Sequence, residues 1–103
     1  MLEVELTRRA KLDLAEIWEY IAANNLTAAN QVVQRFGNAF GRIAHMANLG
    51  EVYPDSLPGT RFLTSGAYVI VFILQHDRVQ ISRVLHSARD WQSLIDDVVD
   101  VDE

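Results

Sequence analysis

The residues best suited to chemistry gather in one short segment near the end of the chain. Arg83, His86 and Arg89 lie within seven residues, just where an apolar β-strand is predicted to end. An imidazole can accept and return a proton near neutral pH, and a guanidinium can hold a phosphate or a carboxylate. A β-hairpin needs only apolar strands and a turn. These three side chains therefore indicate a role beyond scaffolding.

Each of these residues also has a purely structural interpretation, which the sequence leaves open. His86 could bond a backbone carbonyl at the strand end, and Arg83 could sit within the sheet and pair with an acid such as Asp90. Arg89 follows the strand and is expected to be exposed. It is therefore the best single candidate for contact with another molecule.

Two apolar segments on either side of a polar turn predict a β-hairpin before these residues. Residues 67–75 and 78–86 read as strands, and His76-Asp77 between them is compatible with a two-residue turn. The first segment is apolar on both faces, which is typical of a central strand. Alternation in the second predicts one face with Val79, Ile81, Arg83 and Leu85 and another with Gln80, Ser82, Val84 and His86.

The first half of the chain predicts a strand and two helices. Residues 2–6 alternate between apolar and polar types, as in a half-buried strand, and Thr7 can cap a helix over residues 8–24. Thr27 is expected to cap a second helix that stops at Gly50. Both helices carry an apolar stripe at helical spacing, so we expect them to form an antiparallel hairpin.

The remaining segments complete an α+β fold with the order β-α-α-β-β-β-α. Residues 53–59 contain both prolines and read as a loop, residues 61–64 as a short strand, and Ser65-Gly66 as a turn. Asp90 can cap a short C-terminal helix that Trp91 anchors. We expect the helix hairpin to pack on a small antiparallel sheet, in a single domain over residues 1–95. Residues 96–103 form an acidic tail.

The distribution of charge argues against non-specific binding to nucleic acids. The net charge is −5, but five acids lie in the tail, and the other nine acids balance the nine bases. Eight of those bases are Arg, which favours specific contacts over a diffuse field. We therefore do not expect the chain to bind nucleic acid directly on its own.

Other classes of protein find little support in the composition. The longest apolar run has eight residues, from Ala67 to Leu74, whereas a membrane-spanning helix needs about 20. We expect no membrane association and a cytoplasmic location. There is no cysteine, the three histidines are scattered, and no Gly-rich loop follows a strand. We therefore expect no metal and no cofactor.

The ordered set of motifs resembles the ParE branch of the ParE/RelE toxins of bacterial type II toxin–antitoxin systems. The resemblance lies in residues 10–22, in the helix with Ala29, Val33, Phe36 and Phe40, and in Gly59-Thr60-Arg61. Residues 79–86 followed by Ala88-Arg89-Asp90 are the most specific part. The resemblance covers residues 2 to 95, which leaves only the acidic tail outside it.

The resemblance implies a toxin that a cognate antitoxin protein neutralises in a hetero-oligomer. ParE-type members inhibit DNA gyrase and stabilise its cleaved-DNA state, and they are inhibitors rather than enzymes. RelE-type members cut mRNA in the ribosome. A third interpretation is a protein with the toxin fold that has no active target and serves only as a complex partner.

The residues argue against the ribonuclease, and the gyrase inhibitor is what the resemblance implies. Cleavage of RNA through the 2′-hydroxyl needs groups that move protons and cations around the phosphate. The candidates for a ribonuclease are His86, Arg61, Arg83 and Arg89. Work inside a ribosome also calls for many basic contacts, whereas this chain has one Lys, and Val69 follows Tyr68 where RelE-like proteins often have a base. For a gyrase inhibitor we expect target contact at Arg83, His86 and Arg89.

A second group of residues is predicted to contact the antitoxin. Arg8 and Arg9 lie at the start of the first helix, where the helix dipole favours anions. Carboxylates of a partner would therefore be favourable there. The alternative is a solvated face with an Arg9–Asp13 pair. We add Trp18 and Trp91 as apolar anchors. The acidic tail could also cover the region from Arg83 to Arg89 and weaken target binding.

Overall fold

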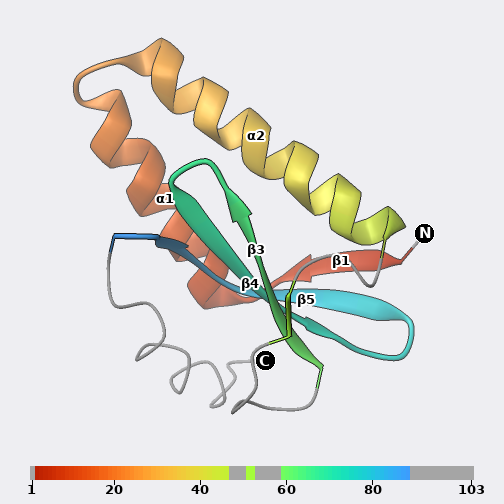
Figure 1. Ribbon diagram of the computed structural model, residues 1–103. Helices are drawn as coiled ribbons and strands as arrows, with labels where there is room; N and C mark the ends of the chain where they lie inside the picture. The colour runs from red at the N-terminus through yellow and green to blue at the C-terminus, as the bar shows by residue number, and fades with distance from the viewer. Residues whose placement is uncertain (1, 47–50, 53–58, 89–103) are drawn as a thin grey trace.

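The computed structural model describes residues 2–46, 51–52 and 59–88, and these form two helices on one face of a sheet (Figure 1). The elements are β1 (Glu3–Leu6), α1 (Arg8–Ala22), α2 (Leu26–His45), β2 (Glu51–Val52), β3 (Thr60–Ser65), β4 (Tyr68–Leu74) and β5 (Arg78–His86). The predicted α+β class is confirmed, and so is the order of the elements except for β2, which was not predicted. The sheet is mixed, where an antiparallel sheet was predicted, because β1 pairs in parallel with β5. The predicted C-terminal helix, the boundary at residue 95 and the acidic tail lie outside the described residues.

The sheet has five strands in the order β1-β5-β4-β3-β2. β3, β4 and β5 form the predicted antiparallel meander, and the Gln75 N–H donates to the Arg78 carbonyl at 2.9 Å across the His76-Asp77 turn. β1 runs parallel to β5, which makes the sheet mixed and places β5 inside it. From β1 the chain passes through the helix hairpin to β2 at the opposite edge of the sheet, and it returns to the side of β1 through β3, β4 and β5.

The parallel pair of β1 and β5 is reinforced at its start by an ion pair. Arg78 lies opposite Glu3, and its Nη1 donates to the Glu5 carboxylate at 3.0 Å. The charge of Glu5, and after it that of Asp77, raises the pKa of Arg78, so this guanidinium stays charged. The pair is exposed and fixes register more than it adds stability.

The main core lies between the helices and the sheet. Its fully buried members come from both helices, β4 and β5: Ala10, Phe36, Ala39, Ile43, Ile70, Phe72, Val79, Ile81 and Val84. A smaller cluster of Val69, Val71 and Leu85, joined by Phe62, lies on the other face of the sheet. Because β4 contributes to both clusters, it is the central, doubly buried strand that its apolar sequence predicted.

A bulge in β5 changes which residues share a face. Val71 is opposite Arg83 but the next residue, Phe72, is opposite Ile81, so Ser82 is the extra residue. One inserted residue moves every later side chain to the other face. Val84 therefore joins Val79 and Ile81 on the helix side. The predicted alternation is correct up to Ile81 and wrong beyond it.

The start of α1 covers the edge of β5 that β1 leaves unpaired. β1 pairs with β5 only as far as Ile81, whose carbonyl accepts the Thr7 N–H at 3.0 Å. The Thr7 hydroxyl donates to the Ser82 carbonyl at 3.0 Å and accepts the Ala10 N–H at 3.0 Å. Thr7 is thus the predicted N-cap of α1 and also a partner for the bulged strand.

A buried ion pair completes the attachment of α1 to β5. The Arg83 Nε and Nη2 atoms donate to the two Asp13 carboxylate oxygens at 2.9 and 3.2 Å, and the Val84 N–H donates to the same carboxylate at 2.9 Å. Both side chains are 5% exposed. Arg83 is therefore paired within the sheet as the structural interpretation held, but with Asp13. Asp90, the suggested partner, lies outside the described residues.

Both ends of α2 differ from the prediction. Asn25 caps α2, because its Oδ1 accepts the Ala28 N–H at 2.9 Å, and Thr27 lies inside the first turn. An Asn side chain before the helix can reach the free N–H groups of the first turn, which Thr27 cannot do from within it. α2 ends at His45, before the predicted stop at Gly50, because Met46 has a non-helical backbone. Gly50 lies outside the described residues.

Among the described residues, no helix is both long enough and apolar enough to cross a membrane.

Removal of the Asp13 carboxylate should destabilise the fold strongly. Asp13→Ala leaves the Arg83 guanidinium buried and unpaired, and loss of one partner of a buried pair costs about 3–5 kcal/mol. Arg9→Ala is the matched control, because Arg9 approaches the same carboxylate at 3.7 Å with a side chain that is 50% exposed. We expect that control to cost less than about 1 kcal/mol. Urea unfolding monitored by circular dichroism measures both, and equal losses would contradict a structural role for the pair.

Gly59 is required by the backbone before β3. Its φ is +87°, and a Cβ there would lie 2.8 Å from the Leu74 carbonyl oxygen. We expect Gly59→Ala to lower the free energy of unfolding by about 1–3 kcal/mol. Gly37→Ala is the control, because a Cβ on that helical glycine meets nothing within 4 Å. It should raise stability by about 0.5–1 kcal/mol. A tolerated Gly59→Ala would show that this backbone can relax.

Candidate functional site

The end of β5 is where the structure places the central residue of the predicted site. His86 is the last residue of β5 and its side chain is exposed. The Ala88 N–H donates to the His86 Nδ1 at 3.0 Å, so Nδ1 carries no hydrogen in this arrangement. The proton of the neutral ring is then on Nε2. His86 thus bonds a backbone amide, where the structural interpretation had expected a carbonyl, and it presents an N–H donor outward.

An aromatic contact chain holds His86 against the rest of the fold. The His86 ring meets the edge of Tyr68 at a centroid distance of 5.2 Å, and Tyr68 meets Phe36 of α2 at 5.3 Å, both nearly perpendicular. Edge-to-face pairs of this kind are a preferred aromatic geometry. Phe36 is buried in the core, so the strand end is anchored to α2 through Tyr68.

Arg83, the other described site residue on β5, is buried. Arg83 is 4% exposed, and its Nε and Nη2 atoms donate to the Asp13 carboxylate. The side chain is thus turned inward, and its direct contact with a target stays a prediction. Arg89 lies outside the described residues.

Arg61 lies far from the end of β5. Arg61 is opposite Phe72 on β4, whereas His86 is opposite Tyr68. The four-residue offset along β4 corresponds to roughly 13 Å, and β4 itself separates the two strands. The backbone positions of Arg61 and His86 are therefore well separated on the sheet.

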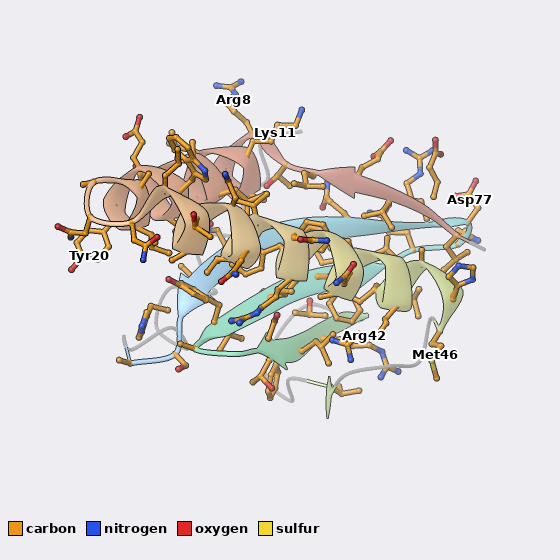
Figure 2. All side chains as sticks on the ribbon, turned by 90° about the horizontal axis from the view of Figure 1, so that it is seen from above. Arg8, Lys11, Tyr20, Arg42, Met46 and Asp77 are labelled. Carbon is orange, nitrogen blue, oxygen red and sulfur yellow. The ribbon has the colours of Figure 1, made fainter. Side chains whose placement is uncertain are left out.

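Three of the residues predicted to meet an antitoxin, Arg8, Arg9 and Trp18, lie on α1. Arg8 is exposed at the start of α1, and Figure 2 shows it and Lys11 projecting away from the sheet. Arg9 lies 3.7 Å from Asp13, as the alternative interpretation held. Trp18 is half-buried, and its indole N–H donates to Asn30 of α2 at 3.0 Å. Trp91 lies outside the described residues.

A cleft of about 500 Å³ opens beside His86, between α1 and the ends of β4 and β5. It is lined from α1 by Asp13, Glu16, Ile17 and Tyr20, and from the strands by Tyr68, Val84, Leu85 and His86. Sequence reasoning missed Asp13, Glu16 and Tyr20 as members of this region. One signal was present for Asp13: an arginine within a sheet needs an acid, and α1 is the neighbouring element that offers one.

The end of β5 brings polar, aromatic and acidic groups close together. The strand end presents a histidine N–H donor, aromatic edges and a carboxylate. No group of three or more potential metal ligands occurs in residues 2–46, 51–52 and 59–88. The arrangement is suited to holding another molecule.

Comparisons with known proteins place the chain among toxin–antitoxin systems. The family described as the ParE toxin of the type II toxin–antitoxin system parDE matches residues 4–91. No curated protein matches significantly. The chain is similar to the chromosomal ParDE toxin–antitoxin system from P. aeruginosa, with 26% identity and a TM-score of 0.71 over 84% of this chain and 96% of that one.

A second similar structure comes from a system with another name. It is the toxin–antitoxin complex RelBE2 from Mycobacterium tuberculosis, with 25% identity and a TM-score of 0.61. The match covers 85% of this chain and 93% of that one. The fold is therefore shared between structures with ParE-type and RelE-type names.

The proton of neutral His86 is expected on Nε2. Long-range ¹H–¹⁵N correlation spectra at about pH 8, above the ordinary pKa of histidine, distinguish the two tautomers. His45 and His76 serve as internal controls, because neither ring forms a hydrogen bond within the described part of the chain. We expect a mixture of tautomers for both. A His86 ring protonated on Nδ1 would contradict the bond from Ala88.

Proposed function

The chain belongs to the ParE toxin family of type II toxin–antitoxin systems, and from this membership we propose that it inhibits DNA gyrase and is neutralised by a cognate antitoxin. It would act in the cytoplasm as a protein inhibitor, with no chemical step of its own. Its stable form in the cell would be a hetero-oligomer with the antitoxin.

The observation that carries the inhibitor over the nuclease is the separation of the candidate catalytic groups. Arg83 is buried in its pair with Asp13, and Arg61 lies roughly 13 Å along the sheet from His86. A ribonuclease of this kind needs a proton acceptor and cations around one phosphate. Among the described residues, Arg61 and Arg83 are not positioned beside His86 in such an arrangement.

The hydrogen bonding of His86 supports the same proposal. A general base needs an unprotonated nitrogen that faces its substrate. In His86 the unprotonated nitrogen is already occupied by the Ala88 N–H, and the outward nitrogen is a donor. A donor at an exposed strand end is suited to binding a carbonyl or carboxylate of a target protein.

We propose that the target surface comprises His86 and the neighbouring Arg89, with Arg83 acting behind them. The Asp13–Arg83 pair holds the last residues of β5 against α1 and so fixes where His86 emerges. Arg83 is in this view a positioning residue. Arg89, three residues after His86, would supply the positive charge of the surface.

For the antitoxin we propose a segment that folds along the helix hairpin. Arg8 would pair with acids of the antitoxin, and Arg9, Trp18 and Trp91 belong to the same proposed surface. Exposed apolar side chains are available on α1 as anchors, since Leu12 is 45% and Tyr20 80% exposed. Coupled folding on an exposed helical face is a common mode for such segments.

The ribosome-dependent mRNA endonuclease is the second candidate, because the RelBE2 complex is also similar to this chain. The third is a partner in a complex with no active target.

The first test is a supercoiling and cleavage assay with purified DNA gyrase, plasmid DNA, ATP and the full chain. We expect loss of supercoiling and accumulation of linear DNA. His86→Ala should weaken inhibition about threefold to tenfold, the range for loss of one hydrogen bond at an interface. His76→Ala is the matched control, because it changes an exposed histidine at the opposite end of β5.

The outcomes separate the three functions. Unaffected gyrase would overturn the proposal. Cleavage of ribosome-bound mRNA that His86→Ala abolishes would then establish the nuclease. Inactivity in both assays by a correctly folded chain would favour the partner without a target. Equal inhibition by the wild type and His86→Ala would contradict only the assignment of His86.

A further inference from the structure

We propose that the cleft between α1 and the end of β5 receives a basic side chain, arginine above all, from the antitoxin. The inference rests on the proposed antitoxin partner and adds the chemistry by which one of its residues is recognised. Its central groups are Glu16 and Tyr20 of α1 and Tyr68 of β4.

The cleft has the shape and lining that an arginine side chain requires. Its volume of about 500 Å³ exceeds the space that one side chain needs. Ile17 and Val84 supply an apolar wall for the methylene stem, and Tyr20 and Tyr68 flank it with aromatic rings. A guanidinium stacks on such rings through cation–π attraction while its stem lies on apolar surface.

The charge on the rim selects a cation. Glu16 makes no ion pair within the described part of the chain. Its neighbours on the helix at three-residue spacing are Asp13 and Glu19, both acids, so their charges disfavour one another. Asp13 is neutralised by Arg83, whereas Glu16 is left for a partner. A bound cation would relieve this repulsion.

The exposure of Tyr20 is the strongest argument that this surface binds a partner. Tyr20 is 80% exposed, the most exposed of the large apolar and aromatic side chains in the described residues. Figure 2 shows it projecting from α1 beyond the ribbon. An aromatic ring held in solvent next to an unpaired carboxylate provides the two elements that recognise a guanidinium.

The same features disfavour other occupants. A nucleotide could stack on the tyrosines, but its phosphate would face the Glu16 carboxylate. The chain's own tail, residues 96–103, carries five acids and no base, so it would also be repelled. An antitoxin segment that runs along α1 can bring a basic residue to Glu16 without such charge repulsion.

The test is an NMR titration of the full ¹⁵N-labelled chain with N-acetyl-arginine amide. N-acetyl-citrulline amide is the control ligand, because it has nearly the same shape but no charge. We expect saturable shifts around Tyr20, Tyr68 and His86 with the arginine compound, and weak or no shifts with citrulline. Adenosine monophosphate tests the nucleotide. Equal binding of the two amino acid amides, or tighter binding of the nucleotide, would overturn the proposal.

Matched variants assign the site. Glu16→Gln should weaken binding of the arginine amide about threefold, the scale of one exposed ion pair, and Tyr20→Ala should weaken it by a similar factor. Glu19→Gln removes the same charge from the same helix outside the cleft and should leave binding unchanged. Equal effects of Glu16→Gln and Glu19→Gln would show that binding depends only on the net charge of the helix, and they would refute the site.

A complex with the co-expressed antitoxin separates this inference from the proposed function. Glu16→Gln should speed dissociation of the complex about threefold at low salt, and the difference should shrink at high salt because screening weakens exposed pairs. Glu16 is not part of the proposed gyrase surface, so inhibition of gyrase by the free chain should be unchanged. Failure of the gyrase assay would thus leave the cleft result standing, and an antitoxin complex indifferent to Glu16→Gln would overturn the cleft alone.

Discussion

The bidentate ion pair between Asp13 and Arg83 is the interaction on which the arrangement of this protein depends. It joins α1 to β5 across 70 residues of sequence, at distances of 2.9 and 3.2 Å. The same carboxylate also accepts the Val84 N–H, so the Asp13 side chain pairs with the buried guanidinium and bonds the edge of β5 that no strand covers. A buried charge is tolerable when it is paired and hydrogen-bonded, and the Asp13 carboxylate supplies both the opposite charge and two hydrogen bonds to Arg83.

The site follows from that attachment and from the bulge at Ser82. The bulge turns Val84 toward the helices, and α1 replaces β1 as the neighbour of β5 beyond Ile81. The strand end is thereby held beside α1, with His86 exposed and tied to Tyr68. The cleft beside it is a consequence of the same docking, because α1 lines one side and the strand ends line the other.

One fold serves toxins of different target classes, so the fold by itself does not decide the activity. What differs is which side chains the strand ends and the helix hairpin present. In this chain the Arg83 guanidinium, which could have bound a phosphate, is paired with Asp13 inside the fold. The Nδ1 atom of His86 accepts the Ala88 N–H, which leaves an N–H donor on the other ring nitrogen. These two facts are the basis on which we propose recognition of a protein target.

The sequence by itself determined the order of the elements other than β2, the Thr7 cap, the His76-Asp77 turn and the central strand, since periodicity, capping and turns are local properties. It also carried the resemblance to the ParE toxins. The partner of Arg83, the bulge that reverses the face of β5, and the meeting of Glu16 and Tyr20 with Tyr68 were decided only by tertiary structure. The ion pair and the cleft join residues that lie far apart in the sequence, and the bulge depends on how β5 pairs with β4. No local pattern encodes them, because they arise when α1 docks against an open strand edge and the buried charges find their partners.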